Sequence, residues 1–276
     1  MQLIITAALL AAAAQTASLP PQAHYVAMGS SFASGPGVTK SADTPPNRCA
    51  RSTDNYARQL ARKRNLMLVD VSCNAMTTKA LLTASGNTPA QLDALTPDTR
   101  LVTVTIGGND VGYMGGLISA SCKHVAAQDA AAAGRCNQSF DPTEQNWADL
   151  EKNMDSIVAE VRKRSPRARL IFVDYLNPMP ERGACDGLPL DADAAAKSRA
   201  IGKRLAEVTA RAAKRGGADI VQASKLSAGH TVCSKQPWTT LYGPLRLSGD
   251  TIYVPYHPNL AGMTAVADAL DHMLGR

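Results

Sequence analysis

The alternation of short apolar runs with longer amphipathic segments constrains the fold of this chain more than any other feature. Five short runs rich in Val and Ile are mostly apolar on both faces, as parallel strands covered by helices must be. They occupy residues 24–29, 66–71, 101–106, 170–175 and 218–222. Helical patterns occupy residues 55–63, 143–164, 191–214 and 259–274, with Pro258 marking the first turn of the last one. This order predicts an α/β fold, a three-layer α/β/α sandwich around a central parallel sheet with right-handed crossovers.

Three stretches fit neither pattern and are expected to leave the compact core. They are residues 126–134, 177–190 and 224–256. Long excursions of this kind usually build binding surfaces or carry disulfides. No internal repeat or low-complexity linker divides the chain, and 276 residues suit one sizeable domain. We therefore expect a single domain over residues 19–276.

Residues 1–18 form an apolar run that ends in small residues. The run is short for a membrane span and fits the apolar region of a secretory signal, with cleavage near Ala17. No Lys or Arg precedes it, so an uncleaved anchor or a buried N-terminal helix is the alternative. No other stretch reaches transmembrane length. We expect a signal peptide over residues 1–18 and a secreted or periplasmic protein without an integral membrane span.

The net charge of +6 raises the question of a nucleic-acid partner. The basic residues are scattered, however, and their densest groups lie in helical patterns, at residues 58–64, 162–169 and 197–215. A solvated helix face explains them better. We expect a monomer that binds no nucleic acid.

The six cysteines predict disulfides rather than a metal site. None forms a C-x-x-C pair, and no histidine stands at metal-ligand spacing beside them. An even number of cysteines behind an export signal is typical of disulfide-bonded proteins. Six cysteines permit 15 connectivities, of which pairing between neighbours in the sequence is the simplest. The cysteines are Cys49, Cys73, Cys122, Cys136, Cys185 and Cys233.

Polar residues follow three of the predicted strands, at the edge of the sheet where ligands of open parallel sheets collect. The segments are Gly29-Ser30-Ser31, then Ser72-Cys73-Asn74-Ala75-Met76-Thr77-Thr78, and Gly107-Gly108-Asn109-Asp110. Each segment alone is typical of an ordinary strand-to-helix turn, in which Ser, Asn and Gly act as caps. A histidine, His257, stands just ahead of the last predicted helix. The order of all four is more specific than any one of them.

In this order the chain resembles the SGNH (GDSL-like) hydrolase family over nearly its whole length beyond the leader. Ser31 stands at the place of the nucleophile, His257 at that of the base, and Asn109 at that of the oxyanion-binding asparagine. The segment that follows Ser31 and the spacing of the cysteines are most similar to the actinomycete-type secreted lipases and esterases. That resemblance implies the SGNH (flavodoxin-like) fold and three disulfides between neighbouring cysteines.

Three residues depart from the family pattern. Ser30 stands where the family has Asp, and Ala75 stands where it has the glycine whose backbone N–H binds the oxyanion. Val254 occupies the place of the triad Asp, three residues before the histidine. The actinomycete-type enzymes share this last departure and resemble Ser-His dyads. We therefore expect a backbone carbonyl near Val254 to orient the imidazole, with Asp250, the nearest upstream carboxylate, as the alternative.

The resemblance implies hydrolysis of carboxylic esters, small or lipid, through an acyl-serine intermediate. A serine hydroxyl needs a base to remove its proton, and the oxyanion needs fixed donors, here the N–H groups of Ser31 and Ala75 and the Asn109 amide. Tyr113 and Trp238 are candidates to line an acyl pocket or a sugar platform, with plain packing as the alternative. Carbohydrate O-deacetylation and an inactive exported binding module are the competing functions.

Signatures of other enzyme classes do not occur in the sequence. It contains no G-x-S-x-G elbow, no phosphate-binding or dinucleotide-binding glycine motif and no H-E-x-x-H. The other histidines, at positions 24, 124, 230 and 272, lack the context of His257. We expect neither a cofactor nor a metal.

Overall fold

A computed structural model describes residues 19–129, 136–185, 188–243, 246–248 and 251–275. Its centre is a five-stranded parallel sheet with the strand order β2-β1-β3-β4-β5. The strands are β1 (His24–Gly29), β2 (Met67–Asp70), β3 (Thr99–Thr105), β4 (Arg169–Val173) and β5 (Asp219–Val221). All four pairings between neighbours are parallel. β1, β3 and β4 form the interior of the sheet. They supply nearly all of the buried apolar residues that the five strands contribute to the core.

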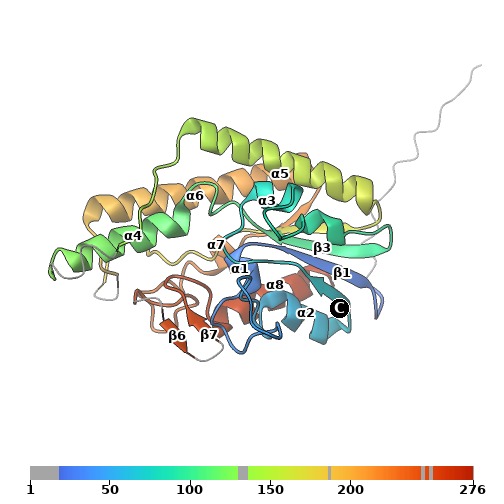
Figure 1. Ribbon diagram of the computed structural model, residues 1–276, viewed down its shortest axis with the longest axis horizontal. Coiled ribbons are helices and arrows are strands. Elements are labelled where there is room, and N and C mark those ends of the chain that lie inside the picture. Colours follow the sequence, from blue (N-terminus) through green and yellow to red (C-terminus); the bar gives the residue numbers. More distant parts are fainter. Residues whose placement is uncertain (1–18, 130–135, 186–187, 244–245, 249–250, 276) are drawn as a thin grey trace, which may run out of the picture.

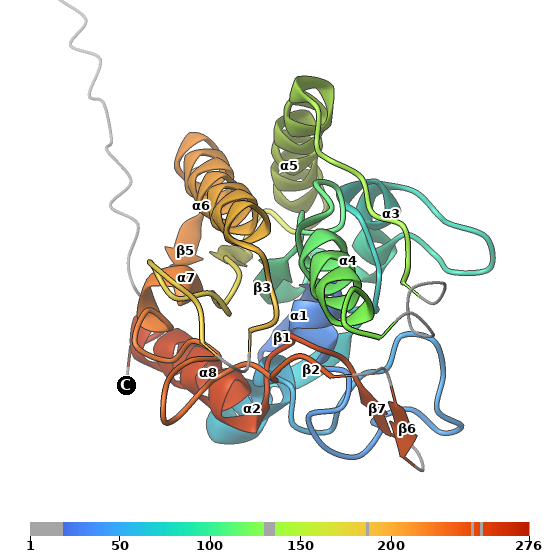
Figure 2. The same cartoon turned by 90° about the vertical axis from the view of Figure 1, so that its left-hand side faces the viewer.

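Helices cover both faces of the sheet, which gives the predicted three layers (Figures 1 and 2). One face carries α3 (Thr78–Leu82), α4 (Tyr113–Ala126), α5 (Glu144–Arg164) and α6 (Ala192–Arg215). The other face carries α2 (Tyr56–Arg64) and α8 (Leu260–Met273). The remaining elements are short: α1 (Ser31–Ser34), η1 (Gln91–Ala94), α7 (Ala223–Leu226) and the hairpin of β6 (Arg246–Ser248) and β7 (Thr251–Tyr253). The α/β sandwich is confirmed.

Local capping sets where the long helices begin. Asn55 accepts a hydrogen bond from the Arg58 amide at the start of α2, and Thr143 and Asn146 form a reciprocal capping box before α5. Asn259 accepts from the Gly262 amide at the start of α8. The assignment of Pro258 to the first turn of this helix is therefore wrong, because Asn259 is the cap and Pro258 precedes it.

The sequence prediction missed two helices that lie next to the polar turns. α4 contains the adjacent glycines Gly115 and Gly116, which weaken the helical signal, and α3 spans a single turn. The predicted excursion at residues 126–134 begins at the last residue of α4, and residues 130–135 lie outside the described part of the chain. Residues 186–187, 244–245 and 249–250, in the other two excursions, lie outside it as well.

The three disulfides join Cys49 to Cys73, Cys122 to Cys136, and Cys185 to Cys233. The pairing between neighbours is confirmed. Cys122 lies on α4, and the other five cysteines lie in connections between elements. The first disulfide joins the connection between α1 and α2 to the turn after β2.

Within the described residues, no helix combines the length and the apolar composition that crossing a bilayer requires. The predicted signal peptide, residues 1–18, lies outside the described part of the chain.

The disulfides Cys185–Cys233 and Cys122–Cys136 should contribute unequally to the free energy of unfolding. Replacing Cys185 and Cys233 by serine should lower the free energy of unfolding by about 4 kcal/mol, and replacing Cys122 and Cys136 by about 3 kcal/mol. The reason is the loop that each bridge closes, with sequence separations of 48 and 14 residues. Urea denaturation of the two double variants measures both values, and a larger loss for the shorter loop would contradict the loop-entropy origin.

Candidate active site

The turn after β1 (residues 29–35, the first turn) presents Ser31 at the carboxyl end of the sheet. The Ser30 amide donates to the carbonyl of Thr105 at the end of β3, at 2.9 Å. Gly29 has φ +140°, and a Cβ there would lie 2.3 Å from the same carbonyl oxygen. The Gln91 side chain bonds both backbone groups of Gly29, at 2.7 and 3.0 Å. The first turn is therefore fixed to the sheet, and only glycine allows this close approach.

Ser31 and His257 meet although 226 residues separate them in the sequence. The Ser31 Oγ lies 2.8 Å from His257 Nε2, and each residue is only 5% exposed. The ring of Phe32 packs against the imidazole, with 5.1 Å between the ring centroids. The two residues that the family pattern singles out are therefore in direct hydrogen-bond contact.

A backbone carbonyl holds the far side of the imidazole. His257 Nδ1 lies 2.8 Å from the carbonyl oxygen of Pro255. A carbonyl only accepts, so Nδ1 carries the proton and Nε2 presents its lone pair to Ser31. The acceptor is one residue beyond Val254, near which it was expected. Asp250, the alternative partner, lies outside the described residues.

The residue between this carbonyl and the histidine has a strained backbone. Tyr256 has φ +60°, in the left-handed region that tyrosine rarely adopts. Its side chain is fully buried, and its hydroxyl lies 2.7 Å from the Ser121 Oγ on α4. Such strain persists where the surrounding contacts fix the backbone, and here the reversal lets Pro255 face the imidazole of the residue two positions on.

The turns after β2 and β3 lie together and carry the two other predicted residues. They comprise residues 72–77 (the second turn) and 107–110 (the third turn). The Asn109 Nδ2 donates to the Met76 carbonyl at 2.8 Å, and Asp110 accepts from the Thr78 amide. Burial raises the pKa of the Asp110 carboxyl, while its bonds to Thr78 oppose that shift. Ala75 is exposed and has φ +63°, a left-handed geometry that favours glycine, the residue that the family pattern has at this place.

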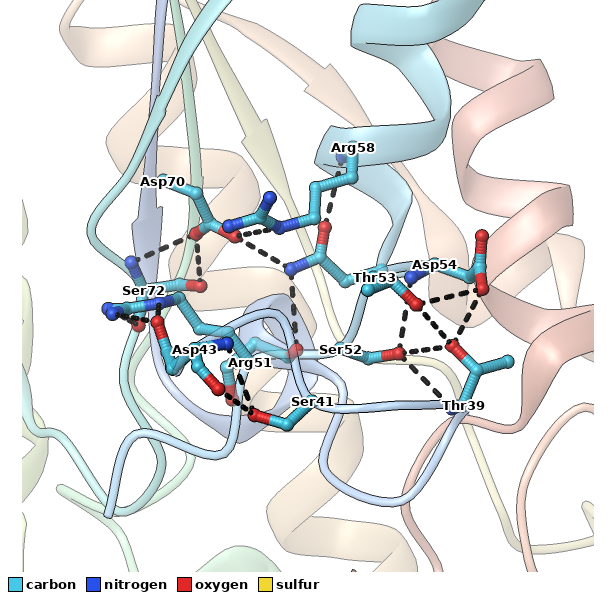
Figure 3. A network of polar contacts seen from close by, with 12 residues as sticks. Thr39, Ser41, Asp43, Arg51, Ser52, Thr53, Asp54, Arg58, Asp70 and Ser72 are labelled. Atoms are coloured by element: carbon cyan, nitrogen blue, oxygen red, sulfur yellow. Dashed lines mark hydrogen bonds and ion pairs between the residues drawn. The ribbon is translucent and has the colours of Figure 1, made fainter. Parts of the chain in front are cut away.

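A polar network braces the second turn against the connection between α1 and α2 (Figure 3). Asp70, with a side chain 1% exposed, accepts from Asn55 Nδ2 at 2.9 Å, from Arg58 Nε at 3.2 Å and from Ser72 Oγ at 2.6 Å. Arg51 donates to the Ser72 carbonyl and forms an ion pair with Asp43. Together with the Cys49–Cys73 disulfide, these bonds fix the backbone leading to Ala75.

The two predicted substrate-contacting residues come from different parts of the chain, Tyr113 from the start of α4 and Trp238 from the connection after α7. Tyr113 is buried under α6, where a Cβ at Gly202 would be 2.5 Å from its hydroxyl, and it lines cavities of about 650 and 590 Å³. Trp238 stacks on His230 at 3.9 Å between centroids, and its carbonyl accepts from the Asn259 amide at the start of α8. A role for either in substrate binding stays a prediction.

One residue of the site escaped the sequence analysis. Tyr175 is two residues beyond β4, and its hydroxyl contacts the first and third turns, through Ser30 and Gly108. The rule that polar side chains at strand ends meet would have found it, but residue 175 was assigned to the strand itself.

The chain belongs to the GDSL-like lipase/acylhydrolase family, which matches residues 27–265. It is 35% identical to lipase 2 of Streptomyces coelicolor over 271 aligned positions, and the alignment covers 95% of this chain and 89% of the relative. It is similar in structure to an extracellular lipase from Streptomyces rimosus (25% identity, TM-score 0.69) and to phospholipase A1 from Streptomyces albidoflavus NA297 (24% identity, TM-score 0.72). Each comparison covers 91% of this chain and 99% of the other. The protein is accordingly a carboxylic ester hydrolase of the SGNH type.

The strained alanine gives a testable consequence. Ala75→Gly should raise the free energy of unfolding by about 1 kcal/mol, because glycine adopts the left-handed region without the Cβ clash. The backbone N–H is retained, so kcat for a short-chain ester should not fall. Ala200→Gly is the matched control: Ala200 is exposed within α6, where glycine should lower the free energy of unfolding by about 1 kcal/mol. Urea denaturation measures both changes. If the free energy of unfolding changes in the same direction in the two variants, the backbone of Ala75 is not strained.

Burial lowers the pKa of His257 from its ordinary 6.5 to about 4, against the opposing effect of the Pro255 carbonyl. The imidazole is then neutral above about pH 4, so the acid limb of kcat/KM should show an apparent pKa near 4. The unfolded chain binds this proton more readily than the native one. Wild-type protein should therefore lose stability relative to His257→Gln as the pH falls from 6.5 to 4. An acid limb centred at 6.5 in the pH–rate profile would contradict the burial effect.

Proposed function

We propose that this protein is a secreted lipase or esterase that cleaves carboxylic esters through an acyl intermediate on Ser31, with His257 as general base and acid. The observation that carries the proposal is the contact between Ser31 Oγ and His257 Nε2, at 2.8 Å. A nucleophile within hydrogen-bond reach of a base that a third group orients is the arrangement that activated serines share. Here the third group is the Pro255 carbonyl.

The reaction then proceeds in two balanced halves. The Ser31 Oγ attacks the ester carbonyl carbon while its proton passes to His257 Nε2. The tetrahedral intermediate collapses, the bond to the alcohol oxygen breaks, and Nε2 returns the proton to the departing alcohol. Water repeats the sequence on the acyl-enzyme: it gives its proton to Nε2, attacks the acyl carbon and releases the carboxylic acid, and Ser31 recovers its proton.

The negative charge of each tetrahedral intermediate falls, in this proposal, on the N–H groups of Ser31 and Ala75 and on the side-chain amide of Asn109. The Ser31 amide opens α1, where backbone N–H groups have no acceptor within the helix. An asparagine amide has two N–H bonds, and Met76 takes one from Asn109. The other remains for the oxyanion. One such donor is typically worth about 3–4 kcal/mol of transition-state stabilisation.

Export from the cell is supported by three observations. The leader has the pattern of a secretory signal, and the three disulfides suit an oxidising compartment. The structurally similar lipase from Streptomyces rimosus is extracellular. We propose that the mature protein acts outside the cytoplasm on lipid or small-molecule esters.

Removing either member of the pair should abolish hydrolysis and leave the fold intact. We expect Ser31→Ala and His257→Ala to lose turnover of p-nitrophenyl butyrate, with wild-type far-UV circular dichroism, and a serine-directed organophosphonate should label wild-type protein but not Ser31→Ala. Wild-type turnover by folded Ser31→Ala protein would refute the proposal.

The competing functions are separated by the substrates that wild-type protein cleaves. Activity on acetylated xylan or chitin oligomers in place of simple esters would indicate an O-deacetylase, and wild-type protein inert on every ester would indicate a binding module.

The choice of a dyad over a triad has its own test. Asp250→Asn should keep most activity, because the Pro255 carbonyl already occupies Nδ1 of His257. Loss of a true triad Asp typically lowers kcat by about 10⁴. A fall of that size in folded Asp250→Asn protein would favour a Ser-His-Asp triad, and Asp271→Asn on α8 is a control for the loss of one carboxylate elsewhere.

A further inference from the structure

We propose that Tyr175 is a positioning residue for ester hydrolysis, whose hydroxyl sets the separation between the turn that carries Ser31 and the turn that carries Asn109. The inference rests on the roles proposed above for Ser31 and Asn109. The observation behind it is the pair of contacts that the Tyr175 hydroxyl makes with Ser30 and Gly108, here called the junction. Neither the family pattern nor the proposed mechanism assigns a role to this junction.

A single oxygen atom joins the immediate neighbours of both residues. The Tyr175 hydroxyl accepts from the Gly108 amide at 2.9 Å and lies 3.0 Å from the Ser30 Oγ. Ser30 is fully buried and Tyr175 is 5% exposed, so water does not readily replace either bond. Gly108 precedes Asn109 and Ser30 precedes Ser31. The oxygen therefore bridges the two turns one residue away from each group that contacts the ester.

The ring of Tyr175 reinforces this junction by shape. A Cβ at Gly108 would lie 2.7 Å from the ring, so the third turn rests directly on its face or edge. On its other side the ring packs against Phe32, with 4.6 Å between centroids, and Phe32 in turn packs against His257. Tyr175, which lies just after β4, therefore contacts a neighbour of each of the three residues: Ser30 beside Ser31, Gly108 beside Asn109, and Phe32, which packs on His257.

The buried hydroxyl of Tyr175 stays neutral. Burial raises the pKa of Tyr175 far above its ordinary value, against the opposing bonds to Ser30 and Gly108. The hydroxyl therefore stays protonated across the working range of a hydrolase, and the proposed role does not require it to ionise. Its contribution is geometric.

The junction also gives a structural meaning to the unusual residue at position 30. Ser30 stands where the family has Asp, and its short hydroxyl reaches Tyr175 within the buried space between the two turns. A carboxylate there would bring a charge into a site with no exposed surface. Serine supplies a neutral hydrogen-bonding partner instead.

Removing only the oxygen tests the role. Tyr175→Phe keeps the ring but leaves the buried Gly108 amide without its acceptor, so the third turn can shift. Displacement of a reacting group by about 1 Å can lower the rate by about 10²-fold. We expect kcat for p-nitrophenyl butyrate to fall by about 10- to 100-fold with little change in KM, because the proposed role is to position Asn109 in the transition state.

A double-mutant cycle identifies the path of the effect. Asn109→Ala alone should lower kcat by about 10²–10³. If Tyr175 acts by placing Asn109, adding Tyr175→Phe to Asn109→Ala should cause little further loss of kcat.

Tyr25→Phe is the matched control. Tyr25 is fully buried, its hydroxyl lies 2.7 Å from Thr103 Oγ1, and it lies near the amino end of β1, away from the site. It should lower the melting temperature and leave kcat unchanged.

Two outcomes would overturn the inference. One is Tyr175→Phe with wild-type kcat and only a lowered melting temperature, as for Tyr25→Phe. The other is an equal fold-loss of kcat in the wild-type and Asn109→Ala backgrounds. If Tyr175→Phe does not fold, Ser30→Ala removes the other partner of the junction and must itself lower kcat at constant KM. Wild-type protein without esterase activity would instead refute the proposed function, so the two failures are distinct.

Discussion

The hydrogen bond from the Ser30 amide to the Thr105 carbonyl, at 2.9 Å, is the contact on which the geometry of the candidate site depends. It forms because the register of β1 and β3 sets Gly29 beside Thr105. The turns that carry Ser31 and Asn109 consequently leave the sheet at the same level from adjacent strands. The sheet therefore brings the two turns together, and the side chains between them, Tyr175 among them, set their final spacing.

Two non-glycine residues of the site have left-handed backbones. Ala75 lies in the turn that offers a backbone N–H, and Tyr256 precedes the histidine. Such conformations typically cost about 1–3 kcal/mol each and persist only where neighbouring contacts fix them. The Cys49–Cys73 bridge and the bonds of Asp70 fix the segment that leads to Ala75, and the contact with Ser121 fixes Tyr256. The two left-handed residues thus lie in the second turn and next to His257, the parts of the chain to which the proposed mechanism assigns an oxyanion donor and a base.

A carbonyl in place of a carboxylate changes the electrostatics of the histidine. The Pro255 oxygen fixes the tautomer of His257 without a full negative charge, so burial dominates and lowers the pKa of the imidazole to about 4. The imidazole is therefore neutral over a wide pH range. In the proposed mechanism, a carbonyl stabilises the imidazolium less than an Asp does, and the donors proposed around Asn109 therefore carry greater weight.

The sequence by itself determined the layered fold, because buried parallel strands leave apolar runs and amphipathic helices leave a periodic stripe. It also determined the positions of Ser31, Asn109 and His257, since these residues stand in a fixed order at strand ends and before the last helix. Only the tertiary structure decided which carbonyl faces His257 and that Tyr175 joins two turns. Such contacts depend on the reversal of the chain at Tyr256 and on the packing of side chains from distant strands. Neither leaves a periodic or local signal in the sequence.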